Sequence, residues 1–321
     1  MTWLIWRQHR NQAAIALAAL VVFVVVVAIT GVHMAGTYHS ALHSCGATDS
    51  CNSIGDNLFS GDGAIIDIVN LSVVVPLLIS LFWGAPLLAR EIEEGTHKLV
   101  WTQSVSRRHW FASKTAALMG ATVLLSTVVT IAATWWERTF DLVDHNRFQS
   151  GHFDVIGIVP VAYAIFGAAL GLAVGSLLRR TLPALAATVA VTVALRVAIA
   201  NYVRPHYLAA LTKVVTFTAA STGIGGSSWT LHTTVVDASG RNVNQRGGLF
   251  ATMPSACRSL VAGPARRDQV LSCLDAHGFR QRIVYQPANR FWTFQGIEAA
   301  IFVVLAVGLV VTAFSVLGRD A

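Results

Sequence analysis

Charge is what this sequence has least of. Of its 321 residues, 12% are charged and 54% are hydrophobic, whereas an average soluble domain carries about 25% charged residues. A soluble protein of this length needs more polar side chains to cover its surface, so the composition argues against an ordinary soluble enzyme. Four cysteines are also too few for a small scaffold held together by disulfides.

Catalytic and nucleotide-binding motifs are missing as well. The sequence contains no G-x-x-x-x-G-K-[ST] phosphate loop and no G-x-S-x-G nucleophile turn, two motifs whose chemistry requires that spacing. In the polar segment 204–293, His206, His232 and His277 lie far apart, and none of the three pairs with another at the i, i+4 spacing of a helical metal site. We therefore expect no catalytic residues, no metal site and no cofactor bound by this chain itself.

Long apolar runs are present instead. A membrane-spanning helix needs about 20 apolar residues, because each residue rises about 1.5 Å and the hydrocarbon core is about 30 Å thick. Six stretches meet this requirement: 13–34, 68–89, 115–135, 155–177, 182–203 and 297–317. The predicted fold class is an all-α polytopic membrane protein with six transmembrane helices.

The orientation of these helices follows from lysine and arginine, which are enriched in short cytoplasmic loops. With the N-terminus inside, the two short outer loops hold only Arg138 and Arg147, and the cytoplasmic segments hold ten basic residues. These ten are Arg7, Arg10, Arg90, Lys98, Arg107, Arg108, Lys114, Arg179, Arg180 and Arg319. Both termini are therefore predicted to be cytoplasmic. The net charge of +7 indicates a membrane protein with a basic inner face rather than a nucleic-acid partner.

The predicted helices divide the chain into three parts. Residues 1–203 hold helices one to five and a cytoplasmic loop at 90–110, and residues 294–321 hold helix six and a cytoplasmic tail. The opening TWLIWRQHR mixes tryptophan and arginine, which is typical of an N-terminal interfacial helix and equally of an ordinary flank with aromatic anchors.

Residues 204–293 form the one sizeable polar segment, which we predict to be a small α+β extracellular domain. Residues 227–243 alternate around a turn signal and predict a strand, a turn and a second strand. Residues 266–279 have helical spacing with Gly278 as the stop, and RIVYQP at 282–287 predicts a strand that ends at Pro287.

The four cysteines all fall in predicted outer segments, where disulfides are favoured. Cys45 and Cys51 lie in the first outer loop, and Cys257 and Cys273 lie in the polar segment. Of the three possible connectivities, pairing within each segment is the simplest. Four free thiols are the alternative.

Charged and small residues within the predicted helices suggest internal contacts. Arg196 and Glu298 lie at similar depth in helices five and six, and an unpaired arginine at a helix centre costs about 2.5–3.5 kcal/mol on insertion scales. We expect the two to pair, as a structural contact or as a latch or cargo contact, with Asp67 as a rival partner. Gly167, Gly171 and Gly175 form a small-residue stripe, which predicts close packing against another helix in the chain or across a dimer.

The cytoplasmic loop carries an unusual group of acids. Glu91, Glu93 and Glu94 precede Gly95 and Thr96, and a basic, aromatic stretch follows. The segment REIEEGTHKLVWTQSVSRRHWFASK resembles the first cytoplasmic loop of type-2 ABC exporter permeases. The segments QPANRFWTFQGIEAAIF and MTWLIWRQHR resemble an actinobacterial branch of that family.

The resemblance implies a membrane subunit that lacks its own ATP site. A separate ABC ATPase subunit would bind ATP and Mg and seat on the five loop residues, and two permease chains, as a homodimer in a bacterial plasma membrane, would form the pathway. The expected activity is efflux of a hydrophobic or amphipathic drug, antibiotic or lipid, as in multidrug resistance. The polar segment of about 90 residues departs from the family pattern, which has short re-entrant helices there.

Other function classes stay open from the sequence alone. A membrane-anchored ligand sensor or resistance protein would act through the outer domain without transport, and a membrane enzyme would carry its site there. A secondary transporter is disfavoured, because the sequence shows no internal repeat and no chain of intramembrane acids.

Overall fold

The computed structural model of the chain describes residues 2–44, 89–90, 93, 106–141, 147–148, 150–217, 228–243, 248–262 and 267–319. The chain forms two compact units. Unit 1 comprises Met1–Val143, Ser150–Arg204 and Trp292–Ala321, and unit 2 comprises Asp144–Gln149 and Pro205–Phe291.

Unit 1 is built from long helices. They are α1 (Thr2–Ser44), α7 (Arg107–Asp141), α9 (Val159–Leu178), α10 (Thr181–Ala198) and α14 (Phe291–Arg319), with the short α8 (Ser150–Phe153) before α9. Five stretches of the described residues are long and apolar enough to cross a membrane: Ala13–Thr37, Arg108–Arg138, Val159–Leu178, Thr181–His206 and Ala288–Val316. They correspond to five of the six predicted helices. The predicted helix at 68–89 lies outside the described residues except for Ala89.

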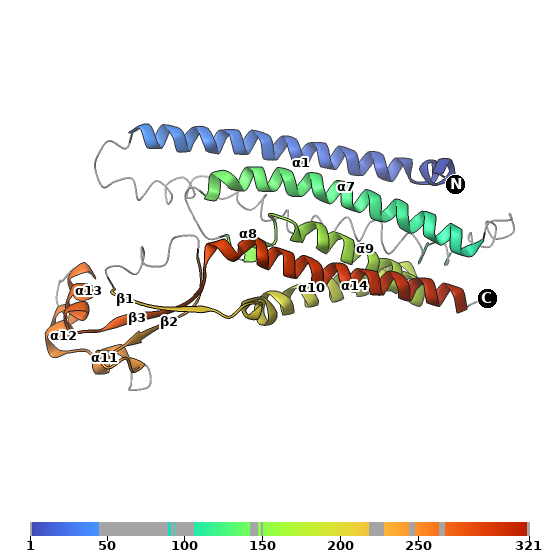
Figure 1. Cartoon of the computed structure of the whole chain (residues 1–321). Coiled ribbons are helices and arrows are strands. Elements are labelled where there is room, and N and C mark those ends of the chain that lie inside the picture. Colours follow the sequence, from blue (N-terminus) through green and yellow to red (C-terminus); the bar gives the residue numbers. More distant parts are fainter. Residues whose placement is uncertain are drawn as a thin grey trace. The chain divides into compact units, whose positions relative to one another are not determined.

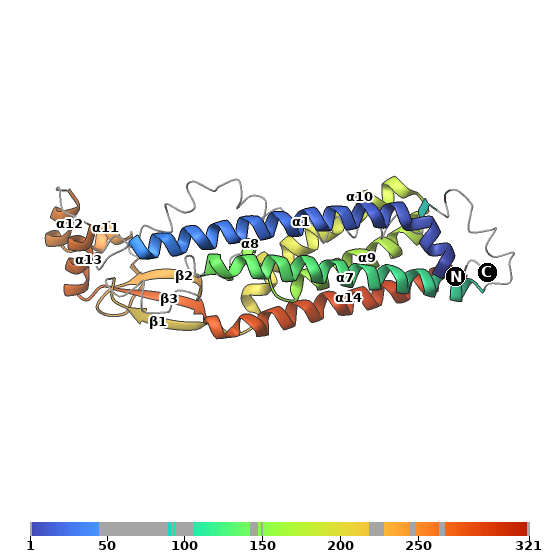
Figure 2. The ribbon, with the colours of Figure 1, turned by 90° about the horizontal axis from the view of Figure 1, so that it is seen from above.

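The directions of these helices constrain how the chain runs through unit 1. In both views α1 and α7 lie side by side and run in the same direction, and α9 runs against α7 (Figures 1 and 2). The start of α1 and the end of α14 lie at the same end of the helix bundle (Figure 2). Neighbouring helices of unit 1 therefore run both parallel and antiparallel to one another.

Helix α9 is the central element of unit 1. It packs against α7 and α10, and its alanines and leucines join Trp110 and Phe111 of α7 and Ala313 of α14 in one apolar cluster. Gly167, Gly171 and Gly175 are all buried within the single chain. Small residues let helices approach closely, and the role of the stripe, within the chain or across a dimer, stays a prediction.

Local sequence explains where several helices begin and end. The Ser106 hydroxyl accepts a hydrogen bond from the His109 amide at 3.3 Å and so caps α7. Pro160 lies in the first turn of α9, where its missing N–H has no cost. Helix α10 continues into a π-helical turn, η4 (Ile199–Val203), and a 3₁₀ turn, η5 (Arg204–His206).

Unit 2 is a three-stranded antiparallel sheet with helices. Its strands are β1 (Leu211–Val215), β2 (Trp229–Val236) and β3 (Arg280–Gln286), in the order β1-β3-β2. Three helices follow β2: α11 (Leu249–Thr252), α12 (Ser255–Ala262) and α13 (Arg267–Ala276). A short 3₁₀ turn, η7 (Ala288–Arg290), leads into α14. Phe217, Val243, Met253, Cys257, Leu274 and Phe279 form the apolar core.

The secondary structure of unit 2 agrees with the sequence in part. Strand β3 ends before Pro287, and α13 ends just before Gly278, which has φ +80°. The predicted second strand after the Asp237–Gly240 turn is wrong: the structure has only a single bridge between Val236 and Asn242 there. The reason is that β2 pairs along its length with β3, which is distant in the sequence, instead of with the residues directly after the turn.

Candidate functional site

A cluster of charged side chains lies buried at one end of the helices of unit 1. It brings together Asp154 after α8, Tyr163 of α9, Arg196 of α10, Arg204 of η5 and Glu298 of α14. The side chains of Arg204 and Glu298 are 1% and 0% exposed. Those of Arg196 and Asp154 are 13% and 12% exposed. The cluster therefore joins four elements: α9 with the turn before it, α10, η5 and α14.

Arg204 makes most of the contacts in this cluster. Its Nε donates to Glu298 Oε2 at 2.8 Å and its Nη2 donates to Glu298 Oε1 at 2.7 Å, a two-point arrangement that fits a guanidinium to a carboxylate. Nη2 also donates to Asp154 Oδ1 and to the Tyr163 hydroxyl. The guanidinium lies 4.1 Å from the centre of the Phe153 ring. The cluster is thus organised around one arginine.

The remaining contacts complete the network. The Tyr163 hydroxyl donates to Glu298 Oε1 and lies 3.2 Å from Asp154 Oδ1. Arg196 Nη2 is 3.4 Å from Asp154 Oδ2, and its guanidinium lies 4.3 Å from the centre of the Tyr163 ring. Two arginines balance two carboxylates, so the buried group is neutral as a whole. Such balance is what permits charges to remain in an apolar environment.

The sequence analysis identified two of these residues and missed the others. Arg196 and Glu298 do lie in one cluster, but the salt bridge at Glu298 is made by Arg204, and the one at Arg196 is made by Asp154. Asp154 and Arg204 each lie one residue outside the predicted helices 155–177 and 182–203, so they were treated as flanks. Opposite charges at the same end of neighbouring helices were the signal that could have found them.

A buried amide fixes the turn that carries Asp154. The Gln295 side-chain oxygen accepts hydrogen bonds from the Ile158 and Val159 amides, at 3.1 and 3.0 Å. Its amino group donates to Phe153 O at 3.0 Å. Gly157 has φ +79°, and a Cβ there would lie 2.7 Å from Gln295 Oε1. Gln295 of α14 therefore supplies the N-terminal cap of α9 that the local sequence lacks.

A second pair joins Glu137 of α7 to His152 of α8. His152 Nδ1 is 2.9 Å from both side-chain oxygens of Glu137, and the Glu137 side chain is 6% exposed. His152 precedes Phe153 and Asp154 in the chain, so this pair ties α7 to the segment that also carries the cluster.

Glu93 is the one acidic residue of the predicted cytoplasmic loop whose structure is described. Its Oε2 accepts hydrogen bonds from the Thr181 amide at 2.9 Å and from the Thr181 hydroxyl at 2.7 Å. These bonds hold the pKa of the exposed Glu93 carboxyl below its usual value, with the hydroxyl bond as the main cause. Nearby, Ala89 is buried together with Ala184 of α10. Ala89 and Glu93 therefore both lie against the start of α10, at the opposite end of that helix from Arg204.

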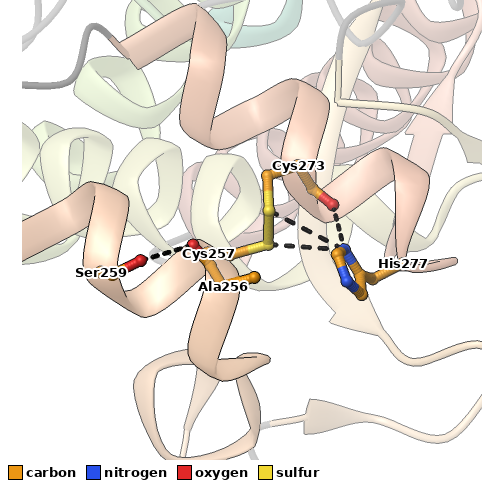
Figure 3. Close-up of a disulfide and its surroundings, with 5 residues drawn as sticks. All are labelled: Ala256, Cys257, Ser259, Cys273 and His277. Atoms are coloured by element: carbon orange, nitrogen blue, oxygen red, sulfur yellow. Dashed lines mark hydrogen bonds between the residues drawn. A yellow bond between two sulfur atoms is a disulfide. The ribbon is translucent and has the colours of Figure 1, made fainter.

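The other predicted loop residues, Glu91, Glu94, Gly95 and Thr96, lie outside the described residues, as do Cys45 and Cys51. Cys257 and Cys273 are joined by a disulfide in unit 2 (Figure 3).

Among the described residues, the charged cluster shows features of a structural or conformational site rather than a catalytic one. It holds two guanidinium–carboxylate pairs and a phenol, all engaged with one another. Such a group can keep four elements together, and it can release them only if its ion pairs separate at the same time.

Comparison with known proteins identifies most of unit 1. The model of the family described as ABC-2 membrane transporter related matches residues 17–204, more than half of the chain. No curated protein and no solved structure shows a significant match.

Proposed function

The chain belongs to the ABC-2 membrane transporter related family, and from this premise we propose that it is the membrane-spanning permease subunit of an ATP-driven exporter. The observation that carries the proposal is the coincidence of the family match over 17–204 with the long apolar helices of unit 1. The cargo that we propose is a hydrophobic or amphipathic drug, antibiotic or lipid, moved out across a bacterial plasma membrane.

The energy for transport would come from a partner. This sequence has no phosphate loop, so a separate ABC ATPase subunit would bind ATP and Mg. We propose that it seats on the loop at 90–110 through Glu91, Glu93, Glu94, Gly95 and Thr96. The hydrogen bonds from Thr181 to Glu93 support this role, because they would pass a movement of the loop directly to α10.

The six-helix layout is supported by the directions of the described helices. Parallel α1 and α7 (Figure 1) require one further crossing between them, and the apolar run 68–89 lies in that interval. Six crossings would place both termini on one side, and the distribution of lysine and arginine supports a cytoplasmic location for that side. Unit 2 would then be extracellular, and a homodimer would form the pathway.

We propose that the charged cluster is a latch at the outer end of the helices. It links α9, α10 and α14 through buried ion pairs, at the opposite end of α10 from the Glu93 contact. Opening the outer end would require these pairs to separate, so the outward-open state would form only when energy is supplied from the cytoplasmic side.

Co-purification tests the central proposal. The tagged chain should carry a phosphate-loop protein with it out of native membranes, and the complex should hydrolyse ATP faster when lipophilic compounds are added. Glu93→Ala should weaken the association, and Asp268→Ala, at an exposed position of α13, serves as a control that leaves the loop intact. A chain that binds lipophilic ligands through unit 2 and recruits no ATPase would instead support the sensor alternative.

A further inference from the structure

The disulfide of unit 2 has a histidine beside it. Cys257 lies on α12 and is fully buried, whereas Cys273 on α13 is half-buried. His277 is exposed and follows Cys273 by four residues, so it lies one turn further on the same side of the chain. Figure 3 shows the imidazole turned toward the two sulfur atoms.

The nitrogen–sulfur distances in this group match those of a metal site. His277 Nδ1 lies 3.6 Å from Cys257 Sγ and 3.8 Å from Cys273 Sγ, and the three donor atoms lie within 4.8 Å of one another. Around a tetrahedral zinc ion, bonds of about 2.3 Å to sulfur and 2.0–2.1 Å to nitrogen place a nitrogen and a sulfur ligand about 3.5 Å apart. The histidine is therefore already near ligand spacing from both cysteines.

The prediction that the chain has no metal site rests on histidine spacing alone. The relevant i, i+4 pair is Cys273 and His277, one thiol and one imidazole on consecutive turns. The third donor, Cys257, comes from a different helix, and only the packing of α12 against α13 brings it there. All three residues belong to unit 2, so the group does not depend on unit 1.

We propose that reduction of the Cys257–Cys273 disulfide converts this group into a binding site for a zinc-like cation. A dithiol reductant gives two electrons and two protons to the disulfide and becomes a disulfide itself, which leaves two cysteine thiols in the protein. The cation then displaces both thiol protons and is bound by two thiolates and neutral His277. Water completes the tetrahedral site.

Coordination also changes the hydrogen bonding of His277. In the oxidised protein its Nδ1 is 2.8 Å from Cys273 O, a bond in which the ring nitrogen donates. Metal binding through Nδ1 moves that proton to Nε2 and releases the carbonyl. The exposed side of the group, at Cys273 and His277, gives the reductant and the cation a route to the sulfur atoms.

Cobalt binding to the whole purified protein in detergent tests the proposal. The variant Cys45→Ser/Cys51→Ser leaves Cys257 and Cys273 as the remaining cysteines. Co²⁺ is added to the oxidised protein and to protein reduced with a phosphine. We expect thiolate-to-cobalt charge-transfer absorption and visible bands of tetrahedral Co²⁺, at one ion per chain, in the reduced protein alone. Added Zn²⁺ should abolish both.

Two histidine variants separate coordination from nonspecific binding. Loss of a residue that only supports a metal ligand already weakens binding about 10–100-fold, so His277→Ala should weaken Co²⁺ binding by at least that factor. His232→Ala, at an exposed position of β2, is the matched control and should bind Co²⁺ like the parent. The proposal is overturned if reduced protein shows no thiolate band, or if His277→Ala binds Co²⁺ as tightly as the parent. Because oxidised and reduced samples share one polypeptide, the comparison stands even if cysteine-to-serine variants at 257 and 273 fail to fold.

Discussion

At the scale of single residues, Arg204 holds the charged cluster together. It contacts Glu298, Asp154, Tyr163 and Phe153, whereas the salt bridge of Arg196 is made with Asp154. The cluster is neutral only while arginines and carboxylates are equal in number. The two arginines should therefore differ in how much stability they contribute.

Arg204→Ala should destabilise the protein severely. It leaves Glu298 and Asp154 buried with a single arginine, and removal of one partner from a buried ion pair typically costs about 3–5 kcal/mol. Thermal unfolding in detergent measures the loss. Arg10→Ala, at an exposed position of α1, should have little effect.

A double-mutant cycle identifies which carboxylate is the main partner of Arg204. Arg204→Ala/Glu298→Ala restores a neutral cluster of Arg196 and Asp154, so its destabilisation should be smaller than the sum of the two singles. The cycle of Arg196 with Glu298 should give a weaker coupling, because the salt bridge of Glu298 is made by Arg204. Strict additivity in the Arg204–Glu298 cycle would contradict the latch.

Gly157 permits a second single-residue test. At φ +79° a side chain is strained, and a Cβ would also meet Gln295, so Gly157→Ala should cost about 1–3 kcal/mol and loosen the cap on α9. Gly308→Ala is the control, because nothing lies within 4 Å of a Cβ at that position of α14. Thermal unfolding separates them: equal midpoints for the two variants would show that the Gly157–Gln295 approach does not matter.

At the scale of elements, hydropathy predicts where the helices lie but not which side chains and strands contact one another. The five described spans coincide with predicted ones because length and apolar content suffice to mark a membrane helix. Helix ends are less certain, so Asp154 and Arg204 were assigned to flanks although they complete the buried cluster. In unit 2, β1 and the pairing of β2 with β3 depend on residues about 50 positions or more apart, which local patterns do not show.

The contact between the loop segment and α10 gives the next prediction. Thr181→Val removes the hydroxyl donor to Glu93 and leaves the backbone amide in place, so it should reduce the coupling of ATP hydrolysis to transport without preventing membrane insertion. The control is Thr188→Val. Thr188 also lies on α10, and its hydroxyl donates a hydrogen bond to Ala184 O. The measurement is the ratio of transport to ATP hydrolysis, and an unchanged ratio in Thr181→Val would exclude this route.

The same contact has a defined dependence on pH. The pKa of Glu93 is lowered from its ordinary 4.5 by the bonds from Thr181, so the ionised carboxylate is the form that docks. A lowered pKa means that this stabilisation is fully present above pH 4.5 and is lost as pH falls through the lowered value. Association with the ATPase at neutral pH should therefore not depend on Glu93 titration. At pH 7, Glu93→Gln should weaken the contact with Thr181 of α10 as much as protonation of Glu93 at low pH weakens it in the parent protein.

At the scale of the whole molecule, the family match and the division into units end at the same point. The match stops at residue 204, and unit 2 resumes the chain at Pro205. Within unit 2 the entering and leaving strands are neighbours, because Leu211 pairs with Tyr285 in the antiparallel register of β1 and β3. Unit 2 thus has the form of an insertion whose two ends meet.

This arrangement predicts that most of unit 2 can be removed. Replacing residues 212–284 by Asn-Gly joins the paired Leu211 and Tyr285 through a two-residue hairpin turn. The bonds at the base remain: Gln286 to Leu208 O at 2.8 Å and Arg290 to Ala209 O at 2.7 Å.

The shortened chain should insert into membranes and recruit the ATPase. Its unfolding midpoint should fall by no more than about 2–4 °C, which corresponds to about 1 kcal/mol. Adding Arg204→Ala to the shortened chain should abolish the remaining stability of its helices against thermal unfolding. If the shortened chain fails to insert while Arg204→Ala in the full chain is tolerated, unit 2 rather than the charged cluster holds the helices together.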